Sequence, residues 1–130
     1  FSEFGYEVIC IDKDKRKKKL FKKNKIPIYE PGLGDLVKKN TNANYLSFSN
    51  NLKSIKGSKI IFIAVGTPTA RRGDGEADLK YVFQVCKELS KLIDKNDKPI
   101  IVTKSTVPIG TGNEIIRLFQ KLCPKLKTLS

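Results

Sequence analysis

The chain has 130 residues, 26 Lys and Arg against 13 Asp and Glu, a formal charge of +13, and no His, Trp or Met. This length allows one domain or part of a larger one. The apolar runs are far shorter than the roughly 20 residues of a membrane span, and the lack of His leaves no Ser-His-Asp triad or Cys-His pair, so composition excludes a transmembrane protein and both kinds of catalytic site.

The first half of the chain predicts strands that alternate with helices. Residues 6–11 (YEVICI) are β-branched and apolar, which favours a strand, and a helix is expected over 14–24. Two prolines and a glycine in residues 26–32 indicate an extended connection. The remaining expectations are a helix over 33–40, a marginal strand over 46–48, and one or two helical turns over 50–56.

The second half continues the alternation. The apolar run at residues 59–65 is typical of a parallel strand buried on both faces, and residues 99–103 predict another buried strand. Asp78 is a good N-cap for a helix with one apolar face, which would place Cys86 in the core. A capping box at residues 111–114 predicts a last helix, whose apolar residues are Ile115, Ile116, Leu118, Phe119 and Leu122.

This alternation predicts an α/β fold with a doubly wound parallel sheet. In such sheets, ligands bind at the carboxyl ends of the strands. Polar residues follow three predicted strands. Asp12 follows the first, where a carboxylate can hold an adenosine ribose and repel a 2′-phosphate, although it could equally cap a helix. Gly66 and Thr67 follow the second, and Ser105 and Thr106 follow the third.

Taken singly, each of these segments could be a simple turn, but their shared placement favours a cofactor crevice. We expect no metal site, because the acidic loop at residues 74–78 fits a glycine-containing surface turn and a helix cap. Cys10, Cys86 and Cys123 are odd in number and lack CxxC spacing. Neither a disulfide framework nor a zinc site is expected, and a cytoplasmic setting fits better.

The positive charge allows a second interpretation. Nine of the thirteen residues in 13–25 are basic, so a lysine-rich module without enzymatic activity could bind anions or nucleic acid. However, 22 of the 26 basic residues are Lys, and no aromatic residues interleave with the basic run in the manner of a stacking platform, which argues against nucleic acid. A solvated helix face is the simpler interpretation.

Four segments, taken together and in this order, are similar to a known family. Residues 4–14 (FGYEVICIDKD), 26–33 (IPIYEPGL), 62–69 (FIAVGTPT) and 104–108 (KSTVP) closely resemble the NAD-binding domain of the UDP-glucose 6-dehydrogenase family, within the UDP-glucose/GDP-mannose dehydrogenases. The resemblance runs over nearly the whole chain.

The resemblance implies a cytoplasmic oxidoreductase, homodimeric at full length, that uses NAD to oxidise UDP-glucose to UDP-glucuronate for polysaccharide biosynthesis. By this analogy Asp12 holds the adenosine ribose, Lys17 lies near the same end of the cofactor, and Thr67 contacts the dinucleotide. Thr106 would lie by the nicotinamide and serve catalysis by positioning a water.

The resemblance also implies parts that these residues lack. Family members carry a first strand with a GxGxxG turn, which holds the pyrophosphate, and a nucleophilic Cys in a later domain. We therefore expect residues 1–130 to be a fragment: a partial NAD-binding domain with an incomplete Rossmann-like doubly wound parallel sheet that lacks its first strand and glycine-rich turn. Substrate-binding and C-terminal domains would be absent, and this fragment alone would be inactive.

Overall fold

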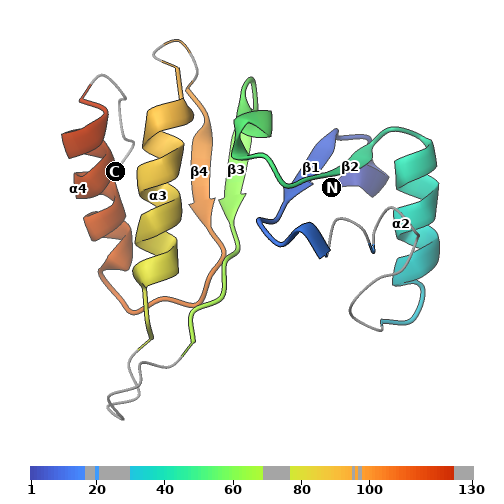
Figure 1. The fold of residues 1–130 in the computed structure, drawn as a ribbon, viewed down its shortest axis with the longest axis horizontal. Coiled ribbons are helices and arrows are strands. Elements are labelled where there is room, and N and C mark those ends of the chain that lie inside the picture. Colours follow the sequence, from blue (N-terminus) through green and yellow to red (C-terminus); the bar gives the residue numbers. More distant parts are fainter. Residues whose placement is uncertain (17–19, 21–29, 69–76, 95, 97, 125–130) are drawn as a thin grey trace. The chain divides into compact units, whose positions relative to one another are not determined.

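The computed structural model describes residues 1–16, 20, 30–68, 77–94, 96 and 98–124. The chain divides into two compact units, Phe1–Ser54 and Ile55–Ser130. Both are built from parallel strands joined through helices (Figure 1). This alternation confirms the predicted α/β class. None of the described helices is long and apolar enough to cross a bilayer.

The first unit contains one pair of parallel strands. A short 3-10 helix, η1 (Ser2–Phe4), precedes β1 (Val8–Ile11), which pairs with β2 (Leu46–Ser49) in the register Val8↔Leu46 to Ile11↔Ser49. The predicted strands at these positions are confirmed, the first of them shorter than expected. Most of the helix expected over residues 14–24 lies outside the described residues, although Lys15, Arg16 and Leu20 are helical.

Helix α2 (Leu33–Asn42) lies beside β2 and is anchored to η1 by polar contacts (Figure 1). The buried amide of Asn40 donates to Glu3 Oε1 and to the Leu36 carbonyl, the latter at 2.8 Å. Lys39 Nζ donates to Glu3 Oε2 at 3.0 Å. The bond from Lys39, followed by that from Asn40, lowers the pKa of the Glu3 carboxyl.

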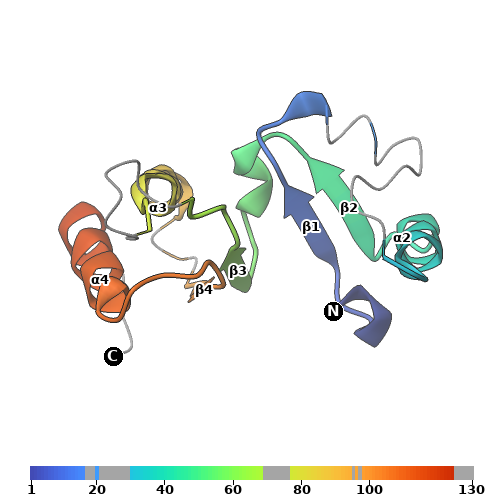
Figure 2. The same cartoon turned by 90° about the horizontal axis from the view of Figure 1, so that it is seen from below.

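The second unit begins with η2 (Leu52–Ile55), which spans the unit boundary and confirms the expected helical turn. Strand β3 (Ile60–Ile63) pairs with β4 (Ile100–Thr103) in the parallel register Ile60↔Ile100 to Ile63↔Thr103. Helix α3 (Lys80–Leu92) joins the two strands, and α4 (Thr111–Leu122) follows β4. Figure 2 shows α3 next to both α4 and the strand pair.

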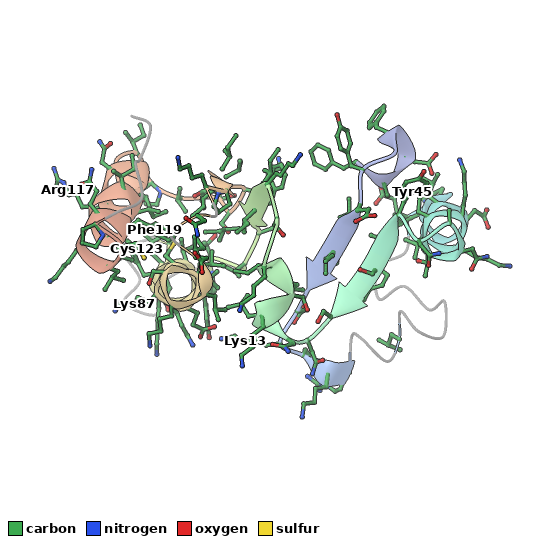
Figure 3. All side chains as sticks on the ribbon, turned by 90° about the horizontal axis from the view of Figure 1, so that it is seen from above. Lys13, Tyr45, Lys87, Arg117, Phe119 and Cys123 are labelled. Atoms are coloured by element: carbon green, nitrogen blue, oxygen red, sulfur yellow. The ribbon has the colours of Figure 1, made fainter. Side chains whose placement is uncertain are left out.

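The core of the second unit lies around α3. Val82, Cys86 and Leu89 are at most 1% exposed, which confirms the predicted apolar face. On α4, Ile115 and Phe119 are buried, and Figure 3 shows Phe119 and Cys123 on the side toward α3. The thiol of Cys123 contacts the Ser90 carbonyl at 2.9 Å. Apolar burial between these elements therefore fixes α3 and α4 against each other.

Two details of the prediction are wrong. The strands of the second unit are not buried on both faces: Ile63 is 2% exposed, but Ile60, Phe62 and Ile100 are 44–58% exposed. Successive side chains of a strand point to opposite faces, so covering one face buries only every second residue. The predicted capping box is also absent. The N-cap of α4 is Gly110 rather than Thr111, and the Thr111 hydroxyl donates to the Pro108 carbonyl at 2.8 Å.

Cys86 provides a test of this core. Burial raises the pKa of its thiol to about 11, so at pH 8 it carries less than about 1% of the thiolate of an ordinary cysteine. We expect iodoacetamide to modify the half-exposed Cys123 at least 100-fold faster than Cys86 in the native chain, and both at similar rates in urea. Peptide mass spectrometry measures the two rates. Equal native rates would contradict this packing.

Glu3 provides a second test. A carboxyl with a lowered pKa binds fewer protons when folded than when unfolded, so its contribution to stability is present above about pH 4.5 and is lost as the pH falls below it. We expect Lys39→Met to raise the titration midpoint of Glu3, measured by NMR, because it removes the strongest contact. Lys38→Met, one position earlier in α2, is the matched control and should leave the midpoint unchanged.

Candidate functional site

The loops that follow β3 and β4 lie side by side in the second unit. Lys104 N donates to the Ile63 carbonyl at 2.8 Å, which extends the strand pairing by one step. Beyond it, Ser105 Oγ donates to the Val65 carbonyl at 2.7 Å. The structure therefore brings together the segments that carry Thr67 and Thr106, as the switch-point rule predicts for neighbouring parallel strands.

The hydroxyl groups in these loops and at the start of α4 differ in whether they have hydrogen-bond partners. Those of Ser105 and Thr111 donate to backbone carbonyls and so belong to the fold. Thr67 is half-buried and Thr106 is exposed, and within the described part of the chain neither hydroxyl has a hydrogen-bond partner. These two side chains can therefore bind an outside ligand without breaking an internal bond.

Gly66 leaves space in front of its backbone. A Cβ placed there would meet no atom within 4 Å, and its φ lies outside the left-handed region that favours glycine. Neither packing nor backbone conformation among the described residues thus requires glycine at this position. A glycine without an internal reason is what close approach of a ligand to the backbone would need.

A backbone hydrogen bond also joins Pro68, which follows Thr67, to Asp78 just before α3. Asp78 N donates to the Pro68 carbonyl at 2.8 Å, and Asp78 Oδ1 accepts from Lys80 N at 2.9 Å. The N-cap of α3 is Leu79 rather than the predicted Asp78, although the Asp78 carboxylate still satisfies the first helical N–H, that of Lys80. The sequence did not predict the bond to Pro68, because a backbone hydrogen bond between residues ten positions apart leaves no pattern in the residue types.

Asp12 lies at the carboxyl end of β1 in the first unit. Its amide donates to the Ser49 carbonyl at 3.1 Å, and its Oδ1 accepts from Asp14 N at 2.9 Å. Asp14 in turn accepts from the amide of Arg16 at 2.9 Å and forms an ion pair with its side chain. Asp14 therefore caps the following helix. The helix-capping role that the sequence allowed for Asp12 is thus filled by Asp14, two residues later.

Several predicted residues fall outside the described part of the chain. Lys17 and most of the basic run at 13–25 are among them, so their roles stay predictions. The same holds for Asp74 and Glu76 in the acidic loop. Among the described residues, no three metal-ligating side chains of His, Cys, Asp or Glu lie together.

The sequence matches the profile of the UDP-glucose/GDP-mannose dehydrogenase family, NAD binding domain, over residues 1–128. It is 46% identical over 125 residues to UDP-glucose 6-dehydrogenase of Rhizobium meliloti, covering 95% of this chain and 28% of that protein. It is 47% identical over 122 residues to UDP-glucose 6-dehydrogenase TuaD of Bacillus subtilis, covering 93% and 26%. The chain thus spans about a quarter of the length of these relatives.

Solved structures of dehydrogenases show the same fold. The ternary complex of GDP-mannose dehydrogenase from Pseudomonas aeruginosa matches with a TM-score of 0.88 and 35% identity, covering 96% of this chain and 29% of that one. A UDP-glucose dehydrogenase from Pyrobaculum islandicum matches with a TM-score of 0.84 and 29% identity, covering 97% and 29%. These matches confirm the α/β class predicted from the alternating elements and the Rossmann-like fold implied by the family resemblance.

The space at Gly66 leads to a prediction about stability. Gly66→Ala should raise the free energy of unfolding by about 0.4–1 kcal/mol, because the added methyl meets no described atom, the backbone tolerates it and alanine restricts the unfolded chain. Gly110→Ala is the matched control: its φ of +94° is left-handed, so the same methyl should cost about 1 kcal/mol or more. Urea unfolding measures both. Equal costs would contradict the assignment of Gly66 to ligand approach.

Proposed function

Because the chain belongs to the UDP-glucose/GDP-mannose dehydrogenase family, we propose that residues 1–130 serve as part of the NAD-binding domain of a nucleotide-sugar dehydrogenase. The observation that carries the proposal is the loop pair after β3 and β4, with its open glycine and two available hydroxyls. UDP-glucose is the proposed substrate, supported by the names of the relatives at 46% and 47% identity. A homodimer and a cytoplasmic location, implied by the same resemblance, complete the proposal.

The described residues fit this cofactor. In the proposal, Asp12 accepts hydrogen bonds from the adenosine ribose hydroxyls, and its negative charge disfavours a 2′-phosphate, so NAD is preferred over NADP. Lys17 lies outside the described residues, and the family resemblance alone supports the proposal that it binds near the same end of the cofactor. Gly66 lets the dinucleotide approach the backbone, and the Thr67 hydroxyl binds it there.

The chemistry of the reaction sets a role for Thr106. Bound NAD accepts hydride, and taking a C6 alcohol to the carboxylate requires two NAD and one water and releases two NADH and three protons. The incoming water must be oriented toward C6. The exposed, unpartnered hydroxyl of Thr106 can hold such a water, which is the catalytic role that we propose for it.

A chimaera tests the proposal. In the Rhizobium meliloti relative, the segment that aligns with this chain over 125 residues is replaced by this chain, and NADH formation from UDP-glucose and NAD is followed by absorbance. We expect turnover from the chimaera and none from the 130 residues alone. A chimaera that folds as the parent does but shows no NAD-dependent rise in melting temperature would contradict the proposal.

In the same chimaera, Asp12→Ala should raise the KM for NAD by about 10-fold to 100-fold, since it removes charged hydrogen bonds worth roughly 1.5–3 kcal/mol. It should also narrow the preference for NAD over NADP. Asp35→Ala is the matched control, because it removes the same charge from an exposed position in the first turn of α2. Similar effects from both variants would indicate a general charge effect and contradict the role of Asp12.

A further inference from the structure

Ser105 makes a bond that strand pairing alone does not supply. Its amide and that of Lys104 both donate to the Ile63 carbonyl, at 3.2 and 2.8 Å, and these bonds end the backbone pairing of β3 with the β4 segment. The Ser105 hydroxyl reaches further. It donates to the Val65 carbonyl at 2.7 Å, two residues beyond the end of β3.

This bond lies next to Thr67, which we propose binds the dinucleotide, and next to Thr106, which we propose holds the water of the reaction. The Val65 carbonyl belongs to the peptide group that leads into Gly66, and Thr67 follows. Ser105 itself immediately precedes Thr106. One side-chain bond therefore couples the loop that carries Thr67 to the loop that carries Thr106, across a sequence separation of 40 residues.

The packed core of the second unit does not depend on the bond from Ser105 to the Val65 carbonyl. The core of the unit consists of apolar side chains on α3 and α4, including Val82, Leu89 and Phe119. The far end of the Gly66 loop is held separately by the bond from Asp78 N to the Pro68 carbonyl at 2.8 Å. Removing the Ser105 hydroxyl should therefore loosen the stretch between Val65 and Pro68 while leaving the packed core intact.

We propose that Ser105 is a positioning residue, whose bond to the Val65 carbonyl fixes the separation of Thr67 and Thr106 so that Thr67 contacts the dinucleotide while Thr106 lies by its nicotinamide. This inference rests on the proposed function. It assigns Ser105 no contact with the cofactor. Preorganisation of this kind acts on affinity, because the free protein then loses less conformational freedom on binding.

The chimaera described above carries the test, with Ser105→Ala, Ser105→Thr and Ser90→Ala. Ser105→Ala should raise the KM for NAD about fivefold, corresponding to one hydrogen bond of about 1 kcal/mol, and leave the KM for UDP-glucose unchanged. Ser105→Thr keeps the hydroxyl and should restore the KM for NAD. Ser90→Ala is the matched control: it removes another hydroxyl-to-carbonyl bond, to Lys87 at 2.9 Å, and should lower the melting temperature by as little as Ser105→Ala does while leaving both KM values unchanged.

The outcomes separate this inference from the proposed function. A folded chimaera without NAD binding contradicts the proposed function, whereas an active chimaera unaffected by Ser105→Ala overturns only the positioning role. A fall in melting temperature with a rise in both KM values would show a structural role and also overturn it. If the chimaera does not fold, grafting only residues 59–68 and 98–108 into the relative allows the same comparison.

Discussion

The parallel pairing of β3 with β4 is the constraint on which the candidate site depends. Parallel strands end at the same edge of a sheet, so residues 40 positions apart in sequence become neighbours once the register is fixed. The backbone pairing of β3 with β4 sets that register, and α3, which returns the chain from β3 to β4, carries the buried residues Val82, Cys86 and Leu89. Strand pairing thus determines where Thr67 and Thr106 can lie.

The two units achieve order in different ways. Seven of the eight buried hydrophobic residues of the described chain belong to the second unit, and the first unit contributes only Val37. The first unit relies instead on polar contacts, such as those of Glu3 with Lys39 and Asn40. Exposed polar contacts add little stability each, so Asp12 is positioned mainly by strand pairing and by its own turn. The position of Asp12 thus depends on its bonds to Ser49 and Asp14, whereas the positions of Thr67 and Thr106 depend on the pairing of β3 with β4 and on the loop bond that follows it.

The sequence was most informative where structure is set by local periodicity. The apolar face of α3 and the polar ends of the strands were predicted because spacing along one element determines them. The exposure of Ile60 and Phe62 was not, since burial of a strand face depends on which other elements cover it. Thr111 failed as a cap because a competing acceptor, the Pro108 carbonyl, is set by loop geometry. The bond from Ser105 to Val65 was equally hidden, because it requires the strand register.

Ligand-binding residues can be recognised in this fold by what the protein itself does not use. Ser105, Thr111 and Asp78 have polar groups committed to nearby backbone atoms, and removing them would leave those atoms with one bond fewer. The hydroxyls of Thr67 and Thr106 have no hydrogen-bond partner among the described residues. Glycine at position 66 costs conformational entropy on folding, although neither neighbouring atoms nor the backbone dihedrals require it there. Under the proposed function, a bound dinucleotide occupies the space before Gly66 and replaces water at the Thr67 hydroxyl, which gives this combination at one sheet edge its use.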